Sequence, residues 1–353
     1  MQDKLNFQKV KELIAQDSQG KRDFLTPVNN LHALEDGTIT FRDTTMVQGE
    51  GTKDIPFDTT NWAENQILTR LGMPAAYFQK AKQADPELYV RHFNYWAPRA
   101  EGVTRLRTKI TGSPVGLIRG SVSEKYAPMD NEQAINEILA QILQGRDDDY
   151  EVNLFHLDDH RMHLRLTYLD LTKSIGTLPD GTPDYLRIGE DVTNSEVGAG
   201  SFGLNEMIWR LICSNGLVRW ENSGNSFMQR HIHLRPVEFQ ARVAEAMVNH
   251  LNTGQEFLQQ VVATQLQQVQ NPFAVISKLS KQGGFSRGFT DTAKEVFEGD
   301  STALGVINAF TRAARDLSNE RRIEAERFAG KLVDFKPHQW ERLDALEEEE
   351  VTA

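Results

Sequence analysis

Two neighbouring stretches, 102-GVTRLRTKI-110 and 115-VGLIRGSVSEKY-126, decide how the middle of the chain folds. In the first stretch charged and uncharged residues alternate. This predicts a β-strand, because successive side chains of a strand point to opposite faces. Arg105, Arg107 and Lys109 would then share one face. The second stretch predicts a further strand, so the sequence places a row of cations on one face of a sheet.

The pattern of residues divides the chain into four regions. Residues 1–100 mix short helices with turns and predict a small mixed unit, whereas residues 101–235 predict strands around one helix. Residues 236–345 predict a helical region, and residues 346–353 predict an acidic mobile tail. The expected fold class is α+β, with an antiparallel strand-rich core and a crossing helix, followed by a mostly helical C-terminal part.

Periodicity and turn-forming residues predict particular elements. Apolar residues at helical spacing predict the crossing helix at 131–145, and 158-DDHR-161 predicts the loop of a hairpin. The run 174-SIGTLPDGTPDY-185 is rich in turn formers and predicts an exposed loop. Residues 237–270 predict a helix with an interruption at Gly254. Further helices are predicted at 61–81, with a Gly–Met–Pro break, at 290–298 and at 301–333.

Composition narrows the class of protein. The 353 residues are 39% hydrophobic and 25% charged, which is ordinary for a soluble globular protein. With 39 Lys and Arg against 50 Asp and Glu the net charge is −11, which argues against a basic coat protein. The first residues do not have the pattern of a secretory signal, and no apolar run approaches the length of a membrane helix. We therefore expect a cytoplasmic protein with no membrane partner.

Local charge and aromatic content favour nucleic-acid binding. Between residues 91 and 125 there are seven Lys or Arg and two acids, and Tyr89, Phe93, Tyr95 and Trp96 lie at or just before the start of this segment. Cations neutralise phosphates, and aromatic rings among them stack the bases of single strands. The predicted nucleic-acid contacts are Arg105, Arg107, Lys109, Arg119, Lys125, Tyr126, Arg165, Arg210, Arg219, Trp220 and Arg230. The alternative interpretation is that the cations are the polar face of a half-buried strand.

Other chemistry has weaker support in the sequence. Cys213 is the only cysteine and lies in an apolar run, which is typical of a buried, inert thiol. His231 and His233, or the histidines between 156 and 163, could hold a metal, but no cysteine or carboxylate completes the set. The glycines of 198-GAGSFG-203 lack the spacing of a phosphate loop and predict a turn. We expect a non-catalytic binding protein without a cofactor, and the metal question stays open.

Three segments resemble a known family. These are 117-LIRGSVSEKYAPMDNEQAINEI-138, 184-DYLRIGEDVTNSEVGAGSFGLNEMIWRLICSNGL-217 and 303-ALGVINAFTRAARDLSNERRIEAERFAGKLV-333. Together they resemble the phage- and plasmid-borne family catalogued as domain of unknown function 932, over roughly residues 60 to 335. The matching motif residues are Tyr126, Pro128, Asp130, Asn194, Ser195, Gly200, Arg210, Cys213, Asn215, Asn308, Ala309 and Thr311.

The resemblance implies a gene of a mobile element, in the company of replication, recombination or anti-restriction functions. By fold-level analogy it is similar in outline to phage single-strand annealing proteins. We therefore expect a single-stranded DNA-binding homo-oligomer that assists recombination, annealing or repair. The alternative is an acidic module that binds a host DNA-binding defence enzyme, with its negative charge imitating nucleic acid.

Overall fold

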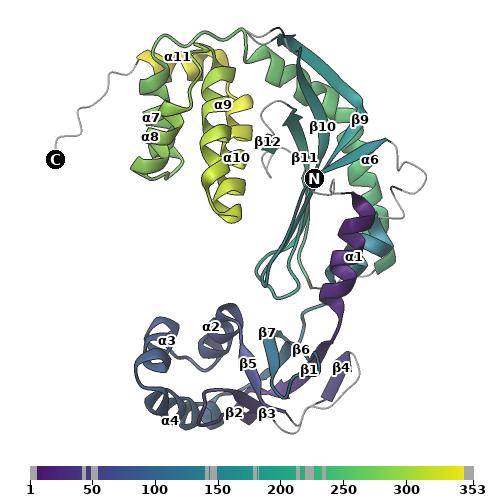
Figure 1. Cartoon of the computed structure of the whole chain (residues 1–353), viewed down its shortest axis with the longest axis vertical. Coiled ribbons are helices and arrows are strands. Elements are labelled where there is room, and N and C mark those ends of the chain that lie inside the picture. Colours follow the sequence, from purple (N-terminus) through teal and green to yellow (C-terminus); the bar gives the residue numbers. More distant parts are fainter. Residues whose placement is uncertain are drawn as a thin grey trace, which may run out of the picture.

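The computed structural model describes residues 6–41, 45–48, 55–139, 143, 149–177, 181, 183–211, 215–218, 226–232 and 236–345. The predictions for Cys213, Arg219, Trp220, His233 and the tail 346–353 lie outside these residues. The fold class is α+β, as predicted. Figure 1 shows a curved molecule with one sheet and three helices at its lower end and a second sheet with the other long helices at its upper end.

The lower sheet has seven strands in the order β2-β3-β5-β7-β6-β1-β4, and all its pairs are antiparallel except β5 with β7. Its strands are β1 (Lys21–Pro27), β2 (Leu31–Ala33), β3 (Ile39–Phe41), β4 (Thr45–Gln48), β5 (Phe57–Thr59), β6 (Val103–Lys109) and β7 (Gly116–Ser123). The two strands predicted at the outset are β6 and β7. They join strands of the first hundred residues, so the predicted boundary at residue 100 falls inside this sheet.

Three helices cover the apolar face of the lower sheet: α2 (Asn61–Arg70), α3 (Ala75–Ala84) and α4 (Pro86–Trp96). Leu106 of β6 and Ile118 of β7 are fully buried in the same core as Tyr89 and Phe93 of α4. The predicted break after the first helix is present, since Gly72 adopts a positive φ of 68°. Short 3₁₀ turns lie at η1 (Val28–Asn30) and η2 (Ala97–Arg99).

The upper sheet runs β12-β11-β10-β9-β8, with β13 also paired to β11, and its pairs are antiparallel. Its strands are β8 (Tyr150–Leu157), β9 (Met162–Thr177), β10 (Pro183–Asn194), β11 (Phe202–Arg210), β12 (Asn215–Val218) and β13 (Ser226–Gln229). The predicted hairpin around Asp158 is confirmed. The run predicted as an exposed loop at 174–185 is mostly exposed in its described residues, but the prediction of a loop is wrong at its ends, because β9 and β10 pair out to Thr177 and Pro183.

The upper sheet buries both faces under helices. Helix α6 (Pro236–Ala263) covers one face. Nδ1 of its residue His250 lies 2.6 Å from Oε2 of Glu190 on β10. Helix α6 continues through Gly254, so the predicted interruption is wrong. A Cβ on Gly254 would lie 2.7 Å from Cγ2 of Ile188, so the glycine permits close packing on the sheet rather than ending the helix.

The C-terminal helices lie on the side of the other face, with α9 and α10 nearest the sheet (Figure 1). They are α7 (Pro272–Gln282), α8 (Arg287–Glu295), α9 (Ala303–Ala313), η4 (Ala314–Asp316), α10 (Asn319–Val333) and α11 (Pro337–Ala345). The single helix predicted at 301–333 is therefore two helices. Arg165 of β9 reaches Glu326 of α10 at 2.5 Å, and this contact places α10 on the sheet.

Two elements join the ends of the molecule. Helix α1 (Phe7–Ser18) buries Phe7, Val10 and Ile14 in the upper core, and the chain then enters β1 of the lower sheet. The crossing helix predicted at 131–145 is present in part as the π-helix η3 (Gln133–Leu139), which also packs into the upper core; residues 140–142 and 144–145 lie outside the described part of the chain. Among the residues described, no helix has the length and apolar character needed to cross a membrane.

Candidate nucleic-acid interface

The row of cations on β6 lies inside the molecule. Arg107 is fully buried, and its guanidinium contacts three partners. Its Nε donates to Oδ1 of Asp23 at 3.1 Å, one terminal nitrogen donates to the backbone oxygen of Glu196 at 2.8 Å, and the other contacts Asp130. The expectation that Arg107 faces a phosphate backbone is therefore wrong, because protein carboxylates and a carbonyl already occupy its donors.

The neighbouring cations of the row are also paired. Arg105 lies 3.4 Å from Asp23, and Nζ of Lys109 lies 2.9 Å from Asp17. Both retain partial exposure, with 14% of the Arg105 side chain and 24% of the Lys109 side chain accessible. The three cations do share one face, as the alternation predicts, but that face is a junction within the protein.

Glu196 is the centre of this junction. It lies in the turn between β10 and β11 and reaches the lower sheet, where Arg119 donates to it at 2.6 Å and Lys21 at 2.9 Å. The backbone N–H of Asn131 also donates to it, at 2.8 Å. Predicted contact Arg119 is thus an internal partner. Because these groups come from β1, β7, the segment just before η3 and the β10–β11 turn, the cluster fixes the two sheets relative to each other.

The electrostatics of the junction follow from burial and pairing. Burial would raise the pKa of Glu196, but Arg119 and Lys21 beside it outweigh this effect, and the pKa lies well below the ordinary value. Burial raises the pKa of Asp23, and the opposing attraction of Arg107 does not cancel the change. The stability of the junction therefore depends on the protonation of its carboxylates.

Two further predicted contacts are internal ion pairs in the upper sheet. Arg165 is fully buried, and its Nε donates to Oδ1 of Asp191 at 2.7 Å in addition to its contact with Glu326. Arg210 donates to both carboxylate oxygens of Asp184, with its Nε at 3.0 Å from each. The expectation that Arg165 contacts nucleic acid is wrong, because no part of it reaches the surface. Arg210 is mostly buried in its pair.

Tyr126 serves the same junction rather than a nucleobase. Its ring is buried and stacked on His231 at 5.1 Å, and its hydroxyl donates to the backbone oxygen of Ser195 at 2.9 Å. Lys125 beside it and Arg230 are exposed. Of the predicted contacts in the described part of the chain, these two are the exposed ones.

An exposed group of rings and cations lies instead on α3, α4 and η2. We call it the α4 surface patch, and its residues are Tyr77, Arg91, His92, Tyr95, Trp96 and Arg99. Tyr95 is 53% exposed, Trp96 47% and Tyr77 49%. Sequence analysis named Tyr95 and Trp96 as rings near the cations but did not include them among the contacts.

Helix geometry builds this patch. Tyr89 and Phe93 lie one turn apart on α4 and face the core, so His92, Tyr95, Trp96 and then Arg99 follow one another on the outer side. The amphipathic spacing of 86-PELYVRHFNYWAPR-99 carries the signal that separates the buried rings from the exposed ones.

Ring contacts order the patch. The Arg99 guanidinium lies 3.9 Å from the centre of the Tyr95 ring, and the Trp96 ring packs edge-on against Tyr95 at 5.2 Å. Tyr77 of α3 stacks on His92 at 6.4 Å with an interplanar angle of 26°. Partly exposed aromatic rings beside arginines are a combination that proteins use to stack the bases of single strands.

The histidines of the described residues do not form a metal-binding group. His156 and His160 both contact Asp158, at 3.1 and 3.8 Å, and His231 is buried against Tyr126. Within the described ranges no three His, Cys, Asp or Glu side chains are grouped so that they could hold a metal ion.

Comparison of the chain with protein-family models, with curated proteins and with solved structures gives no match in any of the three. The family resemblance stays a prediction from the residues quoted for it, and several of those residues have a structural role. Asp130 pairs with Arg107, and Asn194 donates to Asn131 at 2.9 Å. Together with Tyr126 and Ser195 they hold the junction between the sheets.

Proposed function

We propose that the protein binds single-stranded nucleic acid and that the α4 surface patch makes the contact. The observation that carries the proposal is the half-exposed pair Tyr95 and Trp96 with Arg99 stacked over the Tyr95 ring. Large rings are normally buried, so exposed rings beside each other mark a binding surface.

The chemistry of the patch fits a single strand better than a duplex. Bases of a single strand are free to stack on Trp96 and Tyr95, whereas those of a duplex already stack on each other. Arg91 and Arg99 supply positive charge for the phosphates. Residues 91–101 contain one acid, Glu101. Stacking is tolerant of base identity, so we expect weak sequence preference.

The proposal is tested by binding of a labelled single-stranded oligonucleotide to Trp96→Ala and to Tyr95→Ala. Each stacked base contributes about 1–3 kcal/mol, so each variant should bind about tenfold more weakly or worse. Tyr185→Ala is the matched control, because Tyr185 is also an exposed tyrosine, at 37%, but lies on β10. Equal affinities for all the variants and the parent protein would reject the α4 surface patch as the site.

The alternative function, a module that binds a host protein, makes a different prediction for the same variants. Exposed Tyr, Trp and Arg are also enriched in protein interfaces. The net charge of −11 supports this alternative. If it holds, the parent protein shows no salt-dependent binding to single-stranded DNA or RNA.

The biological setting of the proposed function rests on the family resemblance. Assistance to recombination, annealing or repair of a mobile element requires a single strand to be held with its bases accessible. Stacking on one surface patch would leave the hydrogen-bonding edges of the bases exposed for pairing. A homo-oligomer would place several such patches along one strand and raise the avidity.

A further inference from the structure

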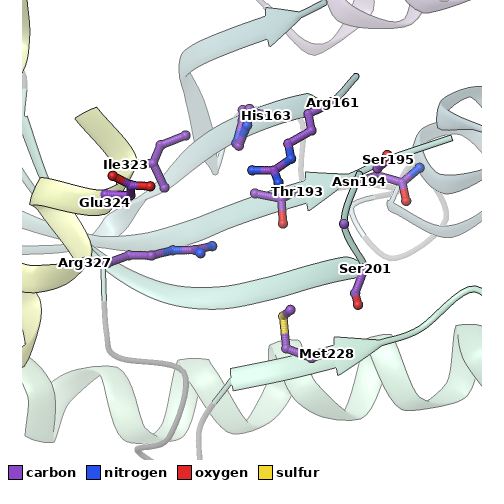
Figure 2. A pocket seen from close by; sticks show the side chains of 11 residues that line it. Arg161, His163, Thr193, Asn194, Ser195, Ser201, Met228, Ile323, Glu324 and Arg327 are labelled. Carbon is purple, nitrogen blue, oxygen red and sulfur yellow. The ribbon is translucent and has the colours of Figure 1, made fainter. Parts of the chain in front are cut away.

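A cavity of about 320 Å³ lies between the upper sheet and α10, far from the α4 surface patch in the chain. Figure 2 shows its walls. It is lined by Arg161, His163, Thr193, Asn194, Ser195, Gly200, Ser201, Met228, Ile323, Glu324 and Arg327. The residues come from β9, β10, the β10–β11 turn, β13 and α10, so the cavity depends on the complete fold of this end.

Two guanidinium groups approach the cavity from different sides (Figure 2). Arg161 is held in place by the backbone oxygen of Ala199, which accepts from its Nε at 3.1 Å and from a terminal nitrogen at 2.6 Å. Arg327 extends from α10, with its terminal nitrogen 3.8 Å from Asp191. Both guanidinium groups lie in the wall of the cavity, and each carries a permanent positive charge.

A buried polar side chain with an unpartnered atom also lines this space. His163 is 4% exposed, and its Nδ1 makes no hydrogen bond. Asn194 also lines the cavity, but its amide is directed to the other face of β10, where its nitrogen donates to the backbone oxygen of Met129 and to Oδ1 of Asn131. Buried polar groups are almost always satisfied, so unsatisfied ones beside a cavity indicate a ligand or ordered water.

The charge balance of the cavity favours an anion. Arg161 and Arg327 are cationic, and Glu324 is the acid of the lining. Burial lowers the pKa of His163 to about 4; nearby Asp191 opposes this change, and the arginines around the ring act in the same direction as burial. At neutral pH the imidazole is therefore uncharged and offers one donor and one acceptor. Thr193, Ser195 and Ser201 add hydroxyl groups.

We propose that this cavity binds a phosphate monoester, with Arg161 and Arg327 on the phosphate oxygens. Guanidinium groups match the oxygens of a phosphate in pairs, and the hydroxyls can donate to those that remain. The volume lies at the lower end of the range for small-ligand sites and exceeds the need of a bare phosphate. Met228 and Ile323 provide an apolar wall for the esterified group, such as the sugar or base of a nucleotide.

The phosphate monoester has two sources with the same chemistry: a free mononucleotide or the 5′ end of a strand. The proposal does not rest on the α4 surface patch, because the two sites share no residue. The first experiment follows the His163 ring signals by NMR while inorganic phosphate and adenosine 5′-monophosphate are titrated in turn into the full-length protein. His163→Gln assigns the signal.

We expect the His163 signal to shift in a saturable way with either ligand, and its pKa to rise because a bound dianion stabilises the imidazolium. Adenosine 5′-monophosphate should bind more tightly than phosphate, and adenosine without the phosphate should not shift the signal. A His163 signal that ignores both phosphate compounds would overturn the proposal without any substitution in the cavity.

Calorimetry of variants tests the arginines. Arg161→Gln and Arg327→Met should each weaken binding of adenosine 5′-monophosphate about tenfold or more, since each removes charge-assisted hydrogen bonds. Lys331→Met is the matched control, one turn along α10 from Arg327 and exposed. Undiminished binding in both arginine variants would overturn the assignment.

Oligonucleotides separate the two sources. A 5′-phosphorylated strand that competes with adenosine 5′-monophosphate, while its 5′-hydroxyl counterpart does not, identifies the site as a reader of strand ends. Competition by neither strand identifies a site for free mononucleotides. Both outcomes are consistent with phosphate monoester binding in the cavity. A loss of strand affinity in Trp96→Ala concerns the α4 surface patch and does not bear on the cavity.

Discussion

The face of β6 and the α4 surface patch contain similar residues in opposite environments. Arg107 on β6 is fully buried among Asp23, Asp130 and the backbone of Glu196, whereas Arg99 on η2 lies over the exposed ring of Tyr95. A row of cations is therefore not a nucleic-acid surface by itself. The positions of the carboxylates in space decide its role, and here they belong to distant parts of the chain.

The largest expected effect that separates the two regions is on folding. Arg107→Met leaves Asp23 and Asp130 without their buried cation and should lower the free energy of unfolding by about 3–5 kcal/mol. Arg91→Met in the α4 surface patch should change it by less than about 0.5 kcal/mol. Urea denaturation of both variants measures the difference. A stable Arg107→Met variant with weakened DNA binding would restore β6 as the interface.

The second prediction concerns pH. Glu196 has a folded-state pKa below its unfolded value, so its contribution to stability is present above about pH 4.3 and is lost as the pH falls below that. Glu196→Gln should therefore cost about 3 kcal/mol at pH 7, and this cost should shrink below pH 4. Denaturation curves of the two proteins across this range provide the check. A pH-independent difference would mean that the glutamate is not ionised in the junction.

The third prediction sharpens the role of stacking in the α4 surface patch. Arg99→Lys keeps the charge but replaces the planar group that lies over Tyr95. The affinity for a single strand should fall severalfold, while the dependence on salt concentration stays the same. Measurement of binding at several salt concentrations tests both parts. A change in salt dependence with no loss of affinity at low salt would indicate that Arg99 contributes only charge.

The smallest expected effect is at Lys125, an exposed cation near the junction. Lys125→Met should change neither the free energy of unfolding nor the affinity for a strand by more than about 0.5 kcal/mol. Arg230→Met is the companion variant. A marked loss of binding in either would extend the interface toward the β10–β11 turn.

Much of the secondary structure was predictable because it depends on local patterns. The alternation in β6 and the helical spacing on each side of Gly72 follow from side-chain periodicity and backbone freedom. The strand ends near 174–185 were missed because most of their described side chains are exposed. Backbone hydrogen bonds between β9 and β10 hold these strand ends together, and such bonds leave no apolar pattern in the sequence.

The site was less predictable because it depends on tertiary contacts. Nothing local in the sequence indicates that Glu196 meets Lys21 and Arg119, which are separated from it by 175 and 77 residues. The α4 surface patch was within reach, since the spacing of Tyr89, Phe93, Tyr95 and Trp96 distinguishes inner from outer rings. Combining the positions of rings with those of cations on one helix would have located it.

The central claim is that the α4 surface patch, and not the face of β6, neutralises the phosphates of a single strand. Two variants that each remove two cations test it: Arg91→Gln with Arg99→Gln, and Arg105→Gln with Lys109→Gln. The measurement is the slope of log affinity against log salt concentration for a labelled single strand. The account predicts that the first variant lowers the magnitude of the slope by about 1.4, since each phosphate contact contributes about 0.7, and that the second leaves it unchanged. A lower slope in the second variant and the parent value in the first would contradict it.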